Sequence, residues 1–139
     1  MSSSAILVTG GAGYVGAHTC KALHLAGYTP VVFDNLSTGH KSFVRWGPFI
    51  PGDIRDTDEV RRTIRAHKIE AVLHFAASAY VGESVADPQK YYENNVEGSL
   101  SLLRAMLEAG CRPLVFSSTC AIYGSQPKSP LVRRRRKIP

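Results

Sequence analysis

A glycine-rich turn between a short apolar run and an amphipathic stretch constrains this chain more than any other feature. Residues Ala5–Thr9 form an apolar run suited to a strand that is buried on both faces. After the turn Gly10–Gly16, the apolar spacing predicts a helix over Tyr14–Ala26, with Gly27 as its C-terminal stop. A strand that runs through a tight turn into a helix begins a strand–helix–strand unit, which favours a parallel sheet.

The glycines of this turn have the spacing of a dinucleotide-binding fingerprint. Gly11, Gly13 and Gly16 satisfy GxGxxG, and Gly10 with Gly13 and Gly16 gives an overlapping spacing. The chemistry needs one glycine for the tight turn, one for close approach of backbone to a pyrophosphate, and one for packing of the helix on the strand. The N–H groups and the positive dipole end at the helix N-terminus would then attract the anion.

The acidic residue expected for such a site follows the next predicted strand, Thr29–Phe33. Asp34 lies 18 residues after Gly16, close to the expected spacing of about 20. A carboxylate at this place accepts hydrogen bonds from the adenosine ribose hydroxyls and repels a 2′-phosphate, so NAD is favoured over NADP. The alternative is a tight turn followed by a surface aspartate.

Further apolar runs continue the alternation after a predicted loop over Asn35–Gly47. Strands are predicted at Phe49–Ile50, Ala71–Phe75 and Leu114–Ser118. Helical patterns separate these strands, and such repeats imply parallel strands joined by right-handed crossovers. The sequence therefore predicts an α/β fold, a Rossmann-type doubly wound parallel sheet that is truncated after about five strands.

Two further helices are predicted between these strands. The first is capped by Asp56 or Thr57, and the second is a long helix that begins at Asp87-Pro88 and ends at Gly110. The large apolar residues of the long helix form a stripe (Tyr92, Val96, Leu100, Leu103 and Leu107) and a second group (Leu102 and Met106). Without a following helix, we expect the second group and part of the fifth strand to be exposed, and the chain to be poorly soluble.

The net charge of +6 is concentrated near the C-terminus. Five of the 17 basic residues lie in Arg133–Lys137, and the rest of the chain holds 12 basic and 11 acidic residues. We therefore expect an NAD-binding domain over residues 1–131 and a basic, disordered tail over residues 132–139. A charge run without interleaved aromatic residues is usually solvated, so no nucleic-acid partner is expected; a tail that binds a phosphate surface is the alternative.

Composition excludes several classes of protein. Apolar residues make up 44% of the chain and charged residues 20%, as in soluble globular proteins. The apolar runs are too short for a membrane span, and Met1–Ser4 lacks the basic region of a signal peptide. The three cysteines include no CxxC, so neither a disulfide framework nor a metal site is expected. These features indicate a cytoplasmic protein with no membrane partner.

Small and polar residues follow the third and fourth predicted strands. Asp53, which precedes Ile54, could meet the adenine amino group of a dinucleotide or cap the next turn, and both alternatives remain open. Phe75 is followed by Ala76 and Ala77, which would allow close approach to the diphosphate and ribose of the cofactor.

Polar residues elsewhere have a functional and a structural interpretation. Asn94 and Asn95 lie on the long helix, where asparagine is a poor helix former, and they face either the crevice or solvent. Thr119, beyond the fifth strand, could hydrogen-bond a substrate hydroxyl or serve a turn. His74 lies inside an apolar strand and is interpreted as a core histidine rather than a metal ligand.

Seven segments together resemble the UDP-glucose 4-epimerases, a family of extended short-chain dehydrogenases/reductases. In chain order they are ILVTGGAGYVGAH from Ile6, FDNLSTG from Phe33, GDIRD from Gly52, HFAA from His74, VGESV from Val81, YYENNV from Tyr91 and FSSTCAIYG from Phe116. The resemblance runs from about Ala5 to about Leu131. The VGESV and YYENN segments are more particular to these epimerases than to the sugar-nucleotide dehydratases.

The resemblance implies an activity, a cofactor and a site. In this family, bound NAD takes a hydride from C4 of UDP-glucose or UDP-galactose and returns it to the other face of the 4-keto sugar. The residues implied to surround NAD are Tyr14, Val15, Asp34, Asn35, Asp53, Ile54, Phe75, Ala76 and Asn94. Thr119 is implied to hydrogen-bond the sugar 4-hydroxyl, whereas Ala79 stands where some members have a cofactor-binding lysine. The family forms homodimers.

The general base of the family, the tyrosine of a Tyr-x-x-x-Lys pair, has no counterpart in these 139 residues. The lysine lowers the pKa of that tyrosine, which at about 10 would be a poor base at neutral pH. The family has an acidic residue and prolines after the position of Leu131, whereas Val132 is followed by four arginines. This tail looks like the product of a truncated or frame-shifted reading of an epimerase gene.

We therefore expect a chain that holds NAD without turnover, and that meets a UDP-sugar only if the missing C-terminal part is supplied. Two alternatives remain open. One is a non-catalytic dinucleotide-binding module that complements another chain. The other is a fragment of an epimerase or dehydratase for a different nucleotide sugar.

Overall fold

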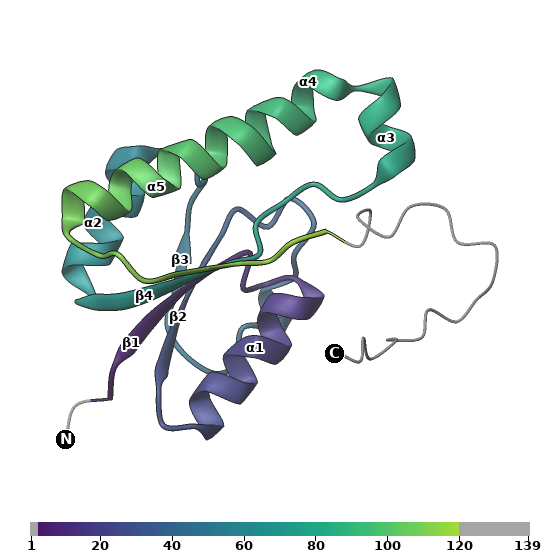
Figure 1. Cartoon of the computed structure of the whole chain (residues 1–139). Coiled ribbons are helices and arrows are strands. Elements are labelled where there is room, and N and C mark those ends of the chain that lie inside the picture. The colour runs from purple at the N-terminus through teal and green to yellow at the C-terminus, as the bar shows by residue number, and fades with distance from the viewer. Residues whose placement is uncertain (1–2, 120–139) are drawn as a thin grey trace, which may run out of the picture.

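Five parallel strands form one sheet in the computed structural model, which describes residues 3–119 (Figure 1). The strands are β1 (Ala5–Thr9), β2 (Thr29–Asp34), β3 (Phe49–Pro51), β4 (Ile69–His74) and β5 (Leu114–Phe116). Their order in the sheet is β3-β2-β1-β4-β5. The chain therefore adds β2 and β3 on one side of β1, and then crosses over to add β4 and β5 on the other side. This reversal creates a switch point between β1 and β4, where ligands bind in such sheets.

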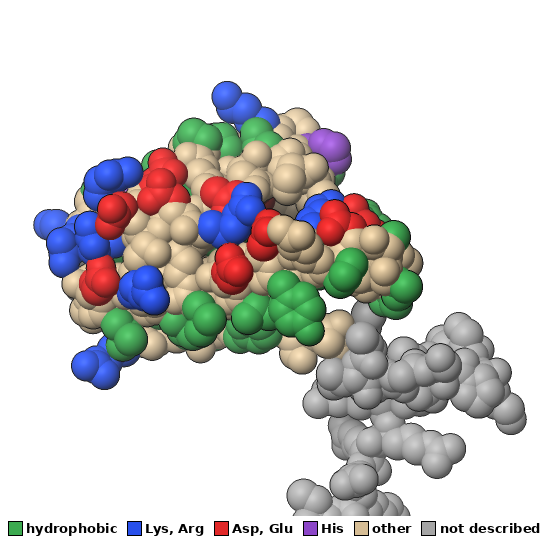
Figure 2. Space-filling model, turned by 90° about the horizontal axis from the view of Figure 1, so that it is seen from above, with side chains coloured by type: hydrophobic (Ala, Val, Ile, Leu, Met, Phe, Trp, Pro, Cys, Tyr) green, Lys and Arg blue, Asp and Glu red, His purple; other side chains and the backbone are tan. Residues whose placement is uncertain are grey.

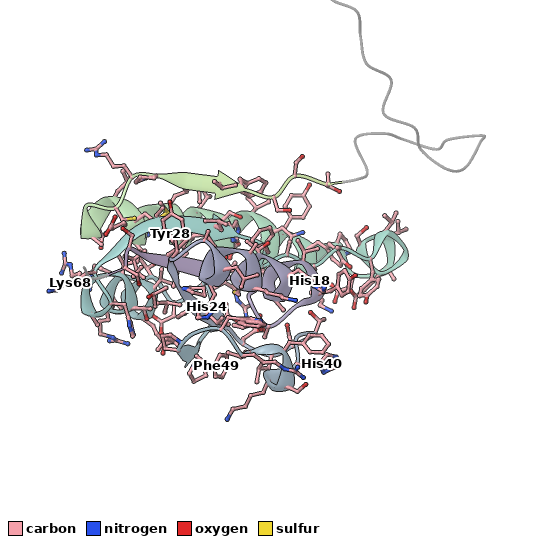
Figure 3. The ribbon with its side chains drawn as sticks, turned by 90° about the horizontal axis from the view of Figure 1, so that it is seen from below. His18, His24, Tyr28, His40, Phe49 and Lys68 are labelled. Atoms are coloured by element: carbon pink, nitrogen blue, oxygen red, sulfur yellow. The ribbon has the colours of Figure 1, made fainter. Side chains whose placement is uncertain are left out.

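Helices cover the sheet unequally (Figures 1 and 3). The first helix, α1 (Tyr14–Leu25), lies on one face, where His18 and His24 mark it in Figure 3. The other face carries α2 (Thr57–Ala66) and α5 (Gly98–Ala109), which pack against each other. The remaining helical segments are η1 (Lys41–Phe43), α3 (Val81–Ala86), α4 (Pro88–Tyr91) and η2 (Tyr92–Glu97). The expected doubly wound α/β architecture is confirmed.

The central strands are buried on both faces, as their continuous apolar runs predict. Leu7 and Val8 are consecutive and point to opposite faces, and both are 0% exposed. Leu7 belongs to the core under α2 and α5, whereas Val8 packs with Cys20 of α1. The register of the sheet then aligns Thr9 with Phe33 on β2 and with His74 on β4. The carboxyl ends of β1, β2 and β4 therefore lie side by side, and the loops that follow these strands start from the same edge of the sheet.

The predicted long helix is three segments rather than one. It runs through α4, the π-helical turn η2 and α5, and the separate helix α3 precedes it. The first and last boundaries agree with the sequence: Asp87 caps α4 through the Lys90 amide, and Gly110 ends α5 at φ +77°. The π-helical turn contains Asn94 and Asn95, which favour regular α-helix poorly.

The prediction of which face of α5 would be bare was wrong. Leu102 and Met106, the second group of the sequence analysis, are buried to 1% and 2% exposure. Gly98 and Ala105 lie on the same face and let the helix approach closely; a Cβ at Gly98 would come within 2.7 Å of Ile54 Cδ1. A narrow stripe that mixes small and large residues therefore packs better here than the stripe of large residues alone.

The stripe of large residues is exposed instead. We call it the exposed stripe; its members are Tyr92, Val96, Leu100, Leu103 and Leu107. Figure 2, viewed from the side of α5, shows hydrophobic side chains in a row along the lower margin of the molecule, below the charged side chains. Among the described residues, no helix has the length and apolar character needed to cross a membrane.

Candidate functional site

A pocket of about 290 Å³ lies at the carboxyl ends of β1, β2 and β4. Its volume is near the lower end of the range for ligand sites, about 300–1,000 Å³. The predicted cofactor residues that line it are Gly10, Gly13, Tyr14, Val15, Gly16, Asp34, Asn35, Ile54, Phe75, Ala76, Ala77 and Asn94. Loops that are far apart in the sequence thus converge at the switch point of the sheet.

The glycine turn is held in a shape that side chains would disrupt. Gly10 has φ +71°, and a Cβ there would lie 2.7 Å from the Ala76 nitrogen. A Cβ at Gly16 would lie 2.2 Å from the Gly10 carbonyl oxygen, so this glycine sets the close packing of α1 on the turn. A Cβ at Gly13 would lie 3.3 Å from the Gly10 carbonyl oxygen, the loosest such contact of the three, and Gly13 lines the pocket. The three glycines therefore divide the roles that the spacing predicts.

The start of α1 is suited to an anion. Its N-cap residue, Gly13, provides no side-chain cap, and the first turn contains no acidic residue. The first N–H groups of a helix have no intrahelical acceptor, and the helix dipole places positive potential there. Tyr14 and Val15 begin the helix and line the pocket. A diphosphate at this place would receive backbone hydrogen bonds.

Asp34 connects the glycine turn to β2. Its side chain accepts the Ala12 amide at 3.0 Å through Oδ2 and the Leu36 amide at 2.8 Å through Oδ1. The residue is only 8% exposed, and it lines the pocket. Because each carboxylate oxygen can accept two hydrogen bonds, both oxygens keep capacity for hydroxyl donors of a ligand. The geometry is compatible with the predicted ribose contact.

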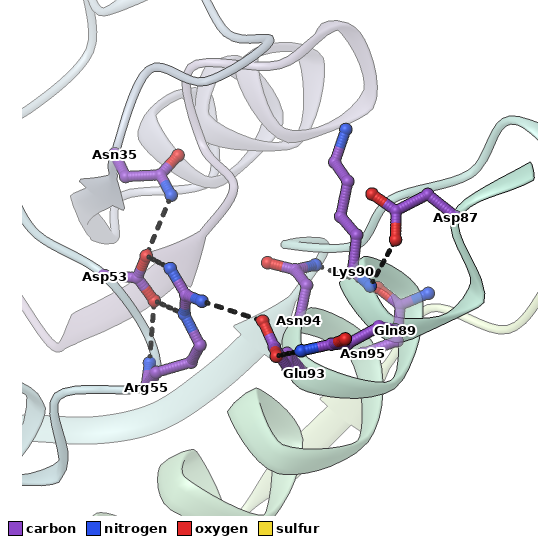
Figure 4. Close-up of polar contacts among 9 residues, drawn as sticks. All are labelled: Asn35, Asp53, Arg55, Asp87, Gln89, Lys90, Glu93, Asn94 and Asn95. Atoms are coloured by element: carbon purple, nitrogen blue, oxygen red, sulfur yellow. Dashed lines mark hydrogen bonds and ion pairs between the residues drawn. The ribbon is translucent and has the colours of Figure 1, made fainter. Parts of the chain in front are cut away.

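Asp53 does not line the pocket, whereas its neighbour Ile54 does. Figure 4 shows Asp53 between Asn35 and Arg55. The Asp53 carboxylate pairs with Arg55 through Nε at 2.9 Å and Nη2 at 2.8 Å. It also accepts the Arg55 amide at 2.9 Å and Asn35 Nδ2 at 3.2 Å. These bonds, above all those from the guanidinium, lower the pKa of Asp53 to about 2. The four bonds occupy the carboxylate, so the adenine contact expected for Asp53 stays a prediction.

Two loops complete the pocket. The segment after β4 supplies Phe75, Ala76 and Ala77, and the side chains of the two alanines are small. Asn94 reaches the pocket from η2. His74, just below this loop, is 4% exposed and hydrogen-bonded, as its interpretation as a core histidine implies. Among residues 3–119, no group of three or more His, Cys, Asp or Glu residues could hold a metal ion.

Thr119 lies three residues beyond β5, is exposed and does not line the pocket. Its predicted contact with a sugar hydroxyl stays a prediction. Residues 1–2 and 120–139 lie outside the described residues. The expected domain boundary at residue 131 and the basic run Arg133–Lys137 fall in that part of the chain.

Several lining residues escaped the sequence reasoning. They are Phe33, Ser37, Thr38, Gly39, Gly52 and Ser78. Ala79, which stands where some members of the family have a cofactor-binding lysine, also lines the pocket. The loop after Asp34 returns to the glycine turn, because the His40 amide donates to the Ala12 carbonyl oxygen at 2.9 Å and Gly39 lies against Ala12. The residues Ser37-Thr38-Gly39 were a detectable turn signal, but nothing local in the sequence shows where such a loop folds back.

These features fit NAD. Gly13 lines the pocket without a side chain, the uncapped helix offers N–H groups to a diphosphate, and Asp34 offers acceptors to ribose hydroxyls. An anion site at a helix N-terminus and a carboxylate acceptor are what a dinucleotide with an unmodified 2′-hydroxyl requires.

Comparison with known proteins agrees with this site. The sequence pattern of the NAD dependent epimerase/dehydratase family matches residues 6–138. A UDP-glucose 4-epimerase of Rhizobium leguminosarum bv. trifolii is 54% identical over 139 residues, which are 100% of this chain and 42% of that protein. A UDP-glucose 4-epimerase of Klebsiella pneumoniae is 44% identical over 135 residues, covering 91% of this chain and 97% of that sequence.

Solved structures show the same likeness in three dimensions. The crystal structure of UDP-glucose 4-epimerase from Brucella ovis in complex with NAD matches with a TM-score of 0.86 and 53% identity. That match covers 93% of this chain and 40% of the crystallised one. The chain thus spans about two fifths of most full-length relatives that it matches. The chain belongs to the NAD-dependent epimerase/dehydratase family.

Proposed function

We propose that this chain is the NAD-binding portion of a UDP-glucose 4-epimerase. The observation that carries the proposal is the pocket at the switch point, where the glycine turn, the uncapped start of α1 and Asp34 converge. The 54% identity to a curated UDP-glucose 4-epimerase supports the substrate class.

In the proposed site, the bound NAD supplies a hydride acceptor and donor for C4 of the sugar. The chain itself binds and orients the cofactor. Backbone N–H groups at Tyr14 and Val15 would hold the diphosphate, and Asp34 would accept hydrogen bonds from the adenosine ribose hydroxyls. The Ala12 and Leu36 amides fix the orientation of that carboxylate at 3.0 and 2.8 Å. Thr119 is the candidate to bind the sugar hydroxyl.

Turnover needs a base that these residues do not contain. No tyrosine among the 139 residues is followed four positions later by lysine. A tyrosine without a neighbouring cation is protonated at neutral pH and cannot take the proton of the sugar hydroxyl efficiently. We therefore expect NAD binding without epimerisation from this chain alone, and a UDP-sugar site only together with further polypeptide.

The exposed stripe suggests where further polypeptide packs. Leu100 and Leu107 are 59% and 65% exposed on a helix whose opposite face is fully buried. Contiguous apolar residues of this kind mark an interaction surface. We place a second copy of the protein here in the complete enzyme, in keeping with the homodimers that the family resemblance implies. Sedimentation velocity at increasing concentration tests this placement.

We also propose a cytoplasmic location. Cys20 and Cys111 are free and buried, and burial raises the pKa of Cys20 to about 11. Buried protonated thiols of this kind are compatible with a reducing compartment.

Calorimetric titration of the full chain with NAD tests the proposed function. We expect saturable binding with one NAD per chain, weaker binding of NADP, and no conversion of UDP-galactose to UDP-glucose. Gly16→Ala would place a Cβ 2.2 Å from the Gly10 carbonyl oxygen and should abolish binding. Gly82→Ala meets nothing within 4 Å and serves as the matched control. A folded wild-type chain that does not bind NAD would refute the proposal.

A further inference from the structure

We propose that Tyr91 is a positioning residue for the nicotinamide half of the cofactor. Its hydroxyl binds the backbone of Tyr80 and thereby holds the end of the pocket segment after β4, residues 75–79. The inference rests on the proposed function, since it concerns the same pocket. Tyr91 itself does not line the pocket, so its effect must pass through Tyr80 and the adjoining segment.

The order of the strands decides which half of the cofactor meets this segment. In the proposed site, Asp34 at the end of β2 receives the adenosine ribose, and the glycine turn after β1 receives the diphosphate. Because β1 lies between β2 and β4, a dinucleotide that continues across the switch point reaches the loop after β4 with its nicotinamide half. Residues 75–79, all of which line the pocket, form that loop.

Two hydrogen bonds hold the start and the middle of the segment. The Phe75 amide donates to the Thr9 carbonyl oxygen at 2.9 Å, which ties the start of the segment to β1. The Ser78 amide donates to Asn95 Oδ1 at 2.8 Å, which ties the middle to η2. Neither bond extends beyond position 78, so the end of the segment is held separately.

The Tyr91 hydroxyl supplies this third anchor. It accepts the Tyr80 amide at 3.0 Å, and it donates its single proton either to the Tyr80 carbonyl oxygen or to Glu83 Oε2, each 2.7 Å away. One oxygen atom thus contacts both backbone polar groups of Tyr80. Partial burial and the hydrogen bond to Glu83 raise the pKa of Tyr91, so the hydroxyl keeps its proton at neutral pH.

Glu83 extends the anchor into α3. Its Oε1 pairs with Lys90 Nζ at 2.6 Å, and its Oε2 lies at the Tyr91 hydroxyl. Both partners belong to α4, so the two carboxylate oxygens hold α3 against α4. The Lys90 ammonium and the Tyr91 hydroxyl hold the pKa of Glu83 below its usual range, and the carboxylate is therefore charged at neutral pH.

Apolar packing contributes little to the position of these two short helices. Figure 1 shows them at the end of α5 that lies away from α2, and no residue of either helix is buried. Tyr80, Val81 and Val85 are 69%, 70% and 80% exposed. A region with few buried contacts opens easily unless polar bonds hold it. The bonds of the Tyr91 hydroxyl are the ones that adjoin the pocket segment.

The experiment is a titration of the full 139-residue chain with NAD and, separately, with ADP, which ends at the diphosphate. Tyr91→Phe removes one oxygen atom, and we expect NAD to bind about fivefold more weakly while ADP keeps its wild-type affinity. Tyr28→Phe is the matched control, because it removes the same atom just before β2, at the opposite end of that strand from the pocket. This variant should bind both ligands as wild type does.

Exchange of the Tyr80 amide, followed by NMR, shows whether the anchor has been released. We expect this amide to exchange faster in Tyr91→Phe, while the amides of Leu7 and Val8 in β1 keep their protection. If Tyr91→Phe does not fold, Glu83→Gln gives the same comparison with a smaller loss of NAD affinity, because it removes the charge that attracts the Tyr91 proton.

Three results would overturn the inference. They are an unchanged exchange rate of the Tyr80 amide in Tyr91→Phe, wild-type NAD affinity in a variant whose Tyr80 amide has been released, and equal losses of NAD and ADP affinity, which would indicate general destabilisation. No NAD binding by the folded wild-type chain would instead refute the proposed function.

Discussion

The central strands of the sheet and its β5 edge differ sharply in how completely they are covered. In β1 and β2, Val8 and Val32 are 0% and 1% exposed. In β5, Val115 and Phe116 are 58% and 60% exposed. The region around β1 and β2 carries the glycine turn and Asp34, whereas the region around β5 carries Thr119. Among the described residues, the half of the fold around β1 and β2 is thus covered on both faces, and we call it the finished half; the half around β5 is exposed, and we call it the unfinished half.

The cause of the difference is the number of neighbours that each element has. β1 lies between β2 and β4, with α1 on one face and α5 with α2 on the other. β5 is an edge strand that pairs only with β4, and the flank of α5 next to the exposed stripe carries no further helix among residues 3–119. A parallel sheet is stable where both faces are covered. Stability and cofactor binding should therefore concentrate in the same half.

The largest expected effect comes from two adjacent leucines of α5 that lie on opposite sides of this divide. Leu102 is 1% exposed and Leu103 is 41% exposed. Leu102→Ala should lower the free energy of unfolding by about 3 kcal/mol or more, because it leaves a cavity under the helix. Leu103→Ala should cost less than about 1 kcal/mol. Chemical denaturation of both variants checks this, and equal losses would show that the two sides of α5 are buried alike.

The second prediction concerns pH and His74, in the finished half. Burial lowers its pKa from the ordinary 6.5 to about 4, so between these pH values the unfolded chain binds a proton that the folded chain does not. The stability contributed by neutral His74 is fully present above pH 6.5 and falls as the pH falls toward 4. We expect a loss of about 2 kcal/mol between pH 7 and pH 5.

Denaturation curves at the two pH values measure this loss. His74→Gln cannot titrate at this position and should show a smaller difference between pH 7 and pH 5 than the wild-type chain. The same pH dependence in both proteins would assign the loss to other groups and contradict the burial argument.

The third prediction concerns the unfinished half. Replacing Leu100 and Leu107 of the exposed stripe by glutamine should reduce self-association about tenfold or more, because each leucine loses apolar area that a partner would bury. Folding stability should change little, since both side chains are already exposed. Sedimentation velocity of the double variant and of wild type measures the effect. Unchanged association would exclude the exposed stripe as the contact surface.

The smallest effect is expected at the rim of the pocket, where Arg55 bridges Asp53 and, at 3.9 Å, Glu93. Half of the Arg55 side chain is exposed, so Arg55→Ala should lower the free energy of unfolding by less than about 1 kcal/mol at neutral pH. Its contribution through Asp53 is present above pH 3.8 and is lost as the pH falls toward 2. Acid titration of the variant should therefore show a shallower decline. A loss of several kcal/mol at pH 7 would contradict a surface role.

The comparison also shows which features a sequence can predict. Strands and the phosphate-binding turn are local patterns: β1 was predicted with its observed bounds, Ala5–Thr9, because its apolar run ends at glycine. Whereas Tyr14, Val15, Asn35 and Ile54 came from the family resemblance, the spacing of the glycines and of Asp34 predicted these as lining residues for the same reason. These residues act through backbone shape and through groups near their own strand ends.

Features that depend on distant partners were not predictable in the same way. The sequence offered two apolar faces on α5, and only the close approach allowed by Gly98 and Ala105 decides that Leu102 is the buried leucine. Asn95 resembled any solvated asparagine, since its partner Ser78 is 17 residues away. Likewise, nothing local indicates that the loop at Gly39 returns to Ala12. Such contacts are tertiary, and one sequence carries no direct signal of them.

Hydrogen–deuterium exchange of the full chain with and without NAD tests the central claim most directly. We predict slower exchange on NAD binding in the glycine turn, in residues 34–39 and in residues 75–79. The exposed stripe and β5 should exchange at the same rate in both samples. Absence of any protection in the glycine turn, or protection confined to α5 and β5, would contradict the assignment of the cofactor to the finished half of the fold.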